Sequence, residues 1–224
     1  MFVSLRRSAR VRAVLGASLL AAALAGCGNK QGDIVVDDSV GIAAVRSPCP
    51  VVAVPEYTGD VTVFSAPGRT DSGAIDVTAT ITNVRSTCDD GAEKLYTVAD
   101  FDVLARRTDT RGARTVELPY FSTVVRGGTA VVAKRVGTVM IQFADGQERA
   151  QGHARAASYV DRAEATLPAD IRERLTRKRN AGDEDAAIDP LSQPDVRNAL
   201  ARASFELLVG FQLTEQQLAY NATR

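Results

Sequence analysis

Hydrophobic and polar residues alternate with a period of two along much of the chain between residues 50 and 160. In the clearest run Ile75, Val77 and Ile81 fall on one face, whereas Asp76 and several threonines fall on the other. Successive side chains of a strand point to opposite faces, so this alternation predicts half-buried strands. Other strand-like runs occupy residues 61–63, 94–106, 114–126 and 139–143.

Short turn sequences separate these runs. Gly127-Gly128 and Asp145-Gly146 tolerate the positive φ angles of tight hairpins. About seven strands joined by short turns predict a mainly β fold, an antiparallel β-sandwich that is immunoglobulin-like only in a loose sense. Pro119 lies inside a strand-like run and predicts a sheet edge or a bulge there, because proline cannot donate to a ladder.

The pattern becomes helical after Asp161. Hydrophobic residues recur every four positions from Ala163 to Leu175, and a second helix is expected from Pro194. Its apolar stripe continues in the same spacing through Val196, Leu200, Ala203, Leu207 and Phe211. Thr214-Glu215-Gln216-Gln217 has the form of a capping box that opens a short last helix. Residues 162–224 are therefore expected to form a helical segment that packs on a sandwich of residues 49–161.

The first 26 residues have the three parts of an export signal. Four arginines precede an apolar run at residues 14–24, which is shorter than a comfortable membrane span. Small residues follow, and the segment ends in Leu24-Ala25-Gly26-Cys27. At this point the sequence resembles a bacterial lipoprotein precursor, whose lipobox is Leu-Ala-Gly-Cys. An ordinary cleaved signal with an incidental cysteine, or an uncleaved single span, is the alternative interpretation.

The resemblance implies that Cys27 carries the lipid and becomes the first residue of the mature protein. Residues 1–26 would then be the signal peptide and residues 27–48 a lipidated N-terminus and tether. Two or three acyl chains are needed for a stable anchor, because one chain holds only marginally. Gly28 after the cysteine resembles the outer-membrane class of lipoproteins, so the expected location is the outer membrane, facing the periplasm.

The two remaining cysteines, Cys49 and Cys88, form an even pair in a chain that is expected to be exported. An oxidising compartment favours a structural disulfide between them. Two buried thiols and a metal site are the alternatives. Two cysteines without a nearby histidine make a poor zinc site, and no metal or cofactor is expected.

Composition narrows the function classes. The chain has 27 basic and 27 acidic residues, and its body becomes mildly acidic once the arginine-rich signal is removed. A mildly acidic body is a poor nucleic-acid binder. The hydrophobic fraction of 45% is enough for a core.

Candidate catalytic groups are few. His153 is the only histidine and is predicted to lie on the polar face of a strand, without a recognisable nucleophile or orienting group. The acidic stretches Asp37-Asp38, Asp89-Asp90 and Asp183-Glu184-Asp185 lack the spacing of a calcium loop. The basic stretch from Arg172 to Arg179 is typical of a solvated helix face, although it could also contact lipid or a partner.

Three hypotheses remain for function. The first is a non-catalytic, membrane-anchored envelope lipoprotein that acts as a structural or protein-interaction module, with the membrane and another envelope protein as partners. The second is a lipid-anchored protein that binds a small molecule or glycan. The third is an envelope enzyme that uses carboxylates or serine. Partner binding predicts an exposed apolar patch or an open sheet edge, whereas ligand binding predicts an enclosed pocket.

Overall fold

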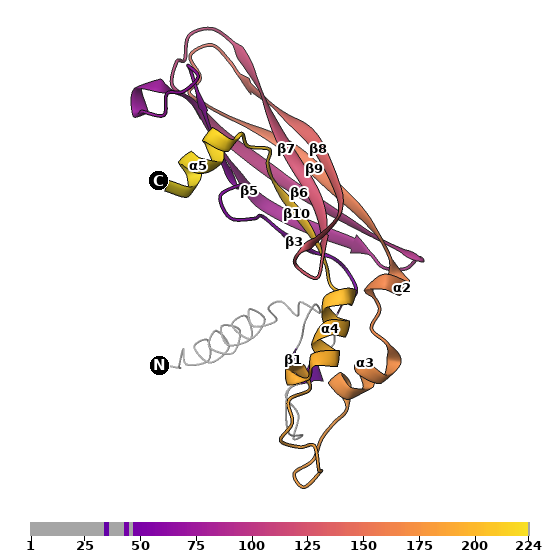
Figure 1. Cartoon of the computed structure of the whole chain (residues 1–224). Helices are drawn as coiled ribbons and strands as arrows, with labels where there is room; N and C mark the ends of the chain where they lie inside the picture. Colours follow the sequence, from indigo (N-terminus) through magenta and orange to yellow (C-terminus); the bar gives the residue numbers. More distant parts are fainter. Residues whose placement is uncertain (1–33, 36–42, 45–46, 224) are drawn as a thin grey trace, which may run out of the picture.

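The computed structural model describes residues 34–35, 43–44 and 47–223, and its main body is two four-stranded sheets that face each other (Figure 1). Sheet I has the order β4 (Asp60–Phe64), β5 (Ile75–Asp89), β6 (Lys94–Arg107) and β9 (Arg149–Asp161). Sheet II has the order β3 (Val51–Ala53), β10 (Phe205–Phe211), β7 (Arg114–Arg126) and β8 (Ala130–Phe143). Every neighbouring pair is antiparallel except β3 with β10. The expected antiparallel β-sandwich is confirmed.

The core lies between the two sheets and follows the alternation seen in the sequence. Val77, Ala79 and Ile81 of β5 are buried, as predicted, and meet residues such as Phe101 and Ile141 from other strands. Each large apolar side chain buried in this way stabilises the fold by about 1.5–3 kcal/mol. Seven strands, β3 to β9, lie between residues 51 and 161, which agrees with the number expected.

Pro119 lies in β7, which is an inner strand between β10 and β8, so the expectation of an edge strand or bulge is wrong. Its carbonyl accepts a hydrogen bond from Gln212 N at 2.9 Å, just past the end of β10. The nitrogen and carbonyl of one strand residue point to the same side. The proline nitrogen therefore faces the chain beyond the end of β10, where the ladder between β10 and β7 has stopped. No backbone acceptor of that ladder needs a hydrogen from Pro119.

The helical prediction holds as far as Ala203 and is wrong for residues 205–211. Helices α2 (Arg162–Ala165), α3 (Ala169–Thr176) and α4 (Pro194–Ala203) and the 3₁₀ turn η3 (Pro190–Ser192) are present. The next residues form β10, which inserts between β3 and β7. Residues four apart share a face in a strand as well as in a helix, so the spacing of Leu207 and Phe211 fits both. Phe205 and Val209 are buried with them, which is the strand period.

Helix α5 (Glu215–Thr223) begins with the predicted capping box. Thr214 N donates to Gln217 Oε1 at 2.9 Å, and Gln217 N donates to Thr214 Oγ1 at 3.3 Å. Of the C-terminal helices, α5 lies against the sandwich beside β4 (Figure 1). The side-chain amide of Gln217 donates to the carbonyl of Thr62 in this strand.

Helices α3 and α4 form a small lobe at one end of the sandwich instead of covering a face, as Figure 1 shows. Ile171, Val196 and Ala199 give this lobe a core of its own. Beside it, β1 (Ile34–Val35) pairs with β2 (Ala43–Ala44), so part of the expected tether forms short strands. Among the described helices none is long and apolar enough to cross a membrane. Cys27 and the expected signal peptide lie outside the described residues.

A disulfide joins Cys49 and Cys88 with their Cα atoms 6.3 Å apart. Cys49 precedes β3 of sheet II, and Cys88 lies near the end of β5 of sheet I, so the bond links the two sheets. The sequence separation of 39 residues corresponds to about 4 kcal/mol in the chain-entropy model.

The most deeply buried charge in the described residues belongs to Arg107 at the end of β6, which is 1% exposed. Its guanidinium donates four hydrogen bonds of 2.7–2.8 Å to backbone carbonyls of the turns after β6 and β8. The acceptors are the carbonyl oxygens of Gln147, Gly112, Thr110 and Ala144. The side chain also lies over the ring of Phe143 at 5.2 Å. The buried guanidinium group of Arg107 therefore holds the backbone of both turns in place.

We predict that Arg107→Lys lowers the free energy of unfolding by about 3 kcal/mol, because an ammonium group cannot reach all four carbonyls and unpaired buried carbonyls are costly. Urea denaturation followed by circular dichroism measures the change. The neighbouring Arg106→Lys is the control, since Arg106 forms an exposed ion pair with Glu148, and such pairs contribute about 0–1 kcal/mol. Equal midpoints for the two variants would contradict the role given to Arg107.

Candidate interaction surfaces

The outer face of sheet I carries a polar cluster around His153. His153 Nδ1 lies 2.5 Å from Asp102 Oδ1, and the amide of Asn83 donates to Asp102 Oδ2 at 2.6 Å. These residues come from β9, β6 and β5, and the register places Asp102 directly between Thr82 and His153. Gly152 and Ala156 point inward, so the polar-face prediction for His153 is confirmed.

The carboxylate of Asp102 is held in its charged form by its neighbours. The hydrogen bond from Asn83 is the largest cause that lowers the pKa of Asp102 below its ordinary value; burial opposes it, and His153 adds to it. Asn83 stands at a register shift in β5 with a φ of 52°, a conformation that asparagine tolerates better than most residues. The local backbone therefore directs this amide towards the carboxylate.

The His153–Asp102 pair is not arranged to activate a nucleophile. The other ring nitrogen of His153 lies 3.4 Å from the amide nitrogen of Gln151, where a catalytic pair would need a hydroxyl or thiol. Within the described ranges, no three His, Cys, Asp or Glu side chains converge in a way that could hold a metal ion.

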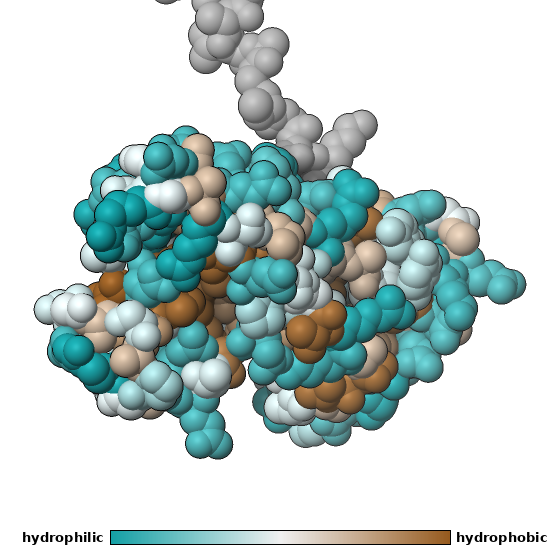
Figure 2. All heavy atoms as spheres, turned by 90° about the horizontal axis from the view of Figure 1, so that it is seen from above, coloured by the Kyte–Doolittle hydropathy of each residue, from teal (hydrophilic) through white to brown (hydrophobic). Residues whose placement is uncertain are grey.

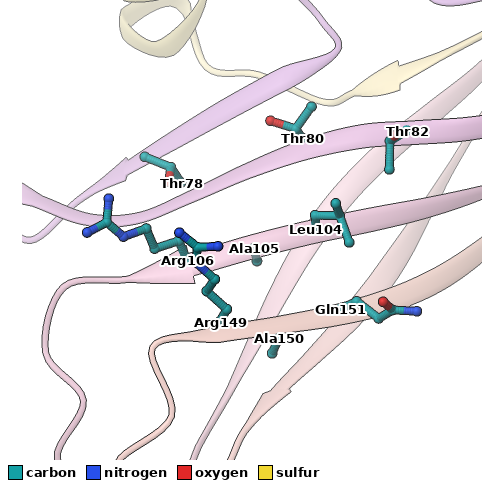
Figure 3. Close-up of a pocket in the computed structure, with 9 residues that line it drawn as sticks. All are labelled: Thr78, Thr80, Thr82, Leu104, Ala105, Arg106, Arg149, Ala150 and Gln151. Atoms are coloured by element: carbon teal, nitrogen blue, oxygen red, sulfur yellow. The ribbon is translucent and has the colours of Figure 1, made fainter.

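An open groove of about 630 Å³ continues along the same outer face (Figure 3). Thr78, Thr80 and Thr82 follow β5, whereas Arg106 and Arg149 lie together at the end of the groove away from Gln151, as Figure 3 shows. This groove is open to solvent and is lined by both polar and apolar groups, unlike the enclosed pocket that captures small molecules.

Most charged residues in the other charged stretches form ion pairs or hydrogen bonds within the chain. Arg174 binds Gln193 and Asp195, Arg177 binds Asp185, and Arg179 is buried and donates to the carbonyl of Ile188. Asp89 ends β5 and accepts a hydrogen bond from the backbone of Gly91, as expected for a turn. Asp37 and Asp38 lie outside the described residues.

Three of the four sheet edges are protected. β3 has only three residues. The β4 edge is covered by α5, because Gln217 donates to the carbonyl of Thr62 at 3.2 Å and Asn221 donates to two further carbonyls at 2.8 Å. β9 carries ion-paired and stacked side chains such as Arg155 with Asp100 and Tyr159 with Tyr96. Short, covered or charged edges resist pairing with other chains.

The fourth edge, β8, contacts β9 of the other sheet but forms no ladder with it. A Cβ atom on Gly152 would lie 2.9 Å from the carbonyl oxygen of Met140, so the two strands approach closely near their turn. Further along, Tyr120 of β7 fills the gap: its ring packs on Gly137 and its hydroxyl donates to the carbonyl of Arg155 at 2.9 Å. Burial raises the pKa of Tyr120, which keeps this hydroxyl a donor.

Residues 130–136 of β8, beyond Tyr120, form a free edge that is largely apolar. Val131, Val132 and Val136 are 64%, 57% and 60% exposed. Figure 2, seen from above, shows a surface that is mainly hydrophilic with hydrophobic residues gathered in a few places. Exposed valines on a long edge strand are the feature expected of an edge that binds another strand.

Neither a family model, a curated protein nor a solved structure matches this chain.

We predict that Asn83→Gly raises the pKa of Asp102 towards its ordinary value, because the variant removes the amide donor while glycine accepts the positive φ. Carboxyl-carbon NMR titration of both proteins measures the change. Since a lowered pKa stabilises the fold above the unfolded value of about 4, the variant also loses stability at neutral pH relative to acid. Asp195, which Arg174 holds, should titrate unchanged. A titration of Asp102 that does not move would contradict this account.

Proposed function

We propose that this protein is a lipid-anchored, non-catalytic component of the bacterial envelope. It binds another envelope protein through the free edge of β8. The observation that carries the proposal is the exposure of Val131, Val132 and Val136 on β8, the edge strand of sheet II. The sequence Leu24-Ala25-Gly26-Cys27 supports the anchor, because it resembles the lipobox at which bacterial lipoproteins are acylated.

The partner contributes an extended segment that adds a strand to sheet II. Strand addition uses the free backbone donors and acceptors of an edge, and pockets for alternate side chains give specificity. Residues 130–136 include Lys134 and Arg135 and no acid. Charge complementarity therefore favours a segment that combines apolar residues with aspartate or glutamate.

A second copy of this chain is a poorer occupant of the same edge. Pairing two β8 strands would bring Lys134 and Arg135 of both copies onto one short ladder. Like charges that face each other across strands are destabilising. The free edge thus favours a different protein over self-association.

The described residues support partner binding at the β8 edge better than they support ligand capture or catalysis. The groove near Arg106 and Arg149 is open to solvent, which suits a transient contact more than retention of a small molecule. The His153 site places an amide where a nucleophile would be needed. These two features keep the interaction hypothesis ahead of the others.

The proposal predicts that Val132→Glu with Val136→Glu abolishes partner capture after crosslinking in intact cells. The tagged protein is purified from membranes, and mass spectrometry identifies what remains attached. Both valines are more than half exposed, so the double variant should fold normally, while its charges oppose an acidic strand. The same two charges placed on the other sheet, in Leu104→Glu with Gln151→Glu, form the matched control.

Cys27→Ala tests the anchor in the same experiment and should move the protein from the membrane to the soluble fraction. Full retention of this variant in membranes would refute the anchor. Capture of the same partner by the β8 variant and by the control would refute the edge as the binding surface.

A further inference from the structure

A small cleft opens between the sheets just inside the free edge of β8. Its volume is about 100 Å³, and its walls come from β7, β8, β9 and β10. It begins where Tyr120 no longer fills the space between β8 and β9. Apolar walls include Val124 and Leu207, whereas Ser122, Ser158 and Arg135 provide the polar groups.

Ser158 is the unusual member of this cleft. It is 4% exposed, and its hydroxyl has no hydrogen-bond partner among the described residues. It lines the cleft together with Ser122, which is also buried. Buried polar atoms almost always have partners, and an orphaned hydroxyl calls for an explanation such as a bound group.

Arg135 places a positive charge at the mouth of the same cleft. It is paired in the ladder with Ser122, and directly paired residues lie on the same face of a sheet. Ser122 faces the interior, so Arg135 lies on the inward face of β8 and yet is exposed because β8 is the edge. No carboxylate within the described ranges forms an ion pair with it. Lys134 differs, since it lies over the ring of Phe121 on the outer side.

An inward-pointing charge on an edge strand can have a purely protective role, because it blocks unwanted pairing with other strands. That role explains Arg135, but it leaves the buried hydroxyl of Ser158 unexplained. A ligand with acceptor atoms explains both residues together. A carboxylate accepts hydrogen bonds from hydroxyls and from a guanidinium group, and it is the anion with which arginine pairs most specifically.

We propose that the cleft receives an aspartate or glutamate side chain from the strand that pairs with β8, with the carboxylate bound by Arg135, Ser122 and Ser158. The inference rests on the proposed function, since it assumes an added strand. Every second residue of such a strand points inward, and one of these positions lies opposite Arg135. A cleft of about 100 Å³ admits a small polar side chain.

The test uses the full-length protein in detergent and two synthetic peptides of seven residues. Both alternate valine and threonine; one has a central glutamate and the other has glutamine in its place. Binding is titrated by NMR for both peptides. The wild type should prefer the glutamate peptide by about tenfold, because charge-assisted hydrogen bonds are stronger than neutral ones. Arg135→Gln should abolish this preference, and Ser158→Ala should reduce it.

Lys134→Gln is the matched control, because it removes the same charge from the adjacent position on the outer face. Its preference for glutamate should equal that of the wild type. Thermal unfolding of Arg135→Gln and Ser158→Ala should match the wild type, so that a loss of preference is not a loss of folding.

Each other outcome overturns a definite claim. Equal binding of both peptides to the wild type would refute the carboxylate site and leave strand addition standing. An equal effect of Lys134→Gln and Arg135→Gln would reduce the preference to general attraction and would also refute the site. If neither peptide binds the wild type, while Val132→Glu with Val136→Glu still removes the cellular partner, the cleft inference fails alone. If that variant also keeps the partner, the proposed function fails with it.

Discussion

The buried guanidinium of Arg107 is the interaction on which the shape of the sandwich depends. It takes a charge out of water, forms no ion pair with a carboxylate of the described residues, and compensates the loss with four backbone carbonyls. These carbonyls belong to the turns after β6 and β8, so one side chain sets where both turns lie. The second of these turns joins β8 to β9. The two strands are therefore close together at this end of the molecule.

The two sides of the sandwich are closed in different ways. On one side, Cys49 is joined to Cys88, α5 binds the carbonyls of β4, and Phe211 N donates to the carbonyl of Thr58. Gly210 permits this closure, since a Cβ atom there would collide with the side chain of Thr58. On the other side, Tyr120 bridges β8 and β9, and a cleft lies between these strands beyond it. The free edge and the cleft behind it are consequences of this asymmetry.

Much of the fold could be predicted from the sequence, because alternation fixes both the strands and their buried faces. The core positions of β5, the polar face of His153 and the capping box at Thr214 follow from local rules. The cysteine pair follows from the even number of cysteines left in a chain that is expected to be exported. β10 was predicted as a helix because its apolar residues four apart fit either period. Only the partner strands β3 and β7, which lie far away in sequence, decide between the two.

The interaction surfaces were harder to predict, because exposure depends on which strands become edges. The sequence nevertheless contains a signal for the two key arginines. Arg107 continues the inward register of Val103 and Ala105, and Arg135 continues that of Val139 and Ile141. An arginine in the inward register is expected to be either buried and fully hydrogen-bonded or placed at an edge. Which of the two applies follows from the strand order, which alternation alone does not provide.

The central claim is that residues 130–136 of β8 are an open edge that a partner strand covers. Hydrogen exchange measured by mass spectrometry tests it directly, on the purified protein and on its complex isolated from membranes. We predict fast exchange of this segment in the protein alone and clear slowing in the complex, with β5 and β6 unchanged. Exchange that is equally slow in both states, or that slows only on sheet I, would contradict the claim.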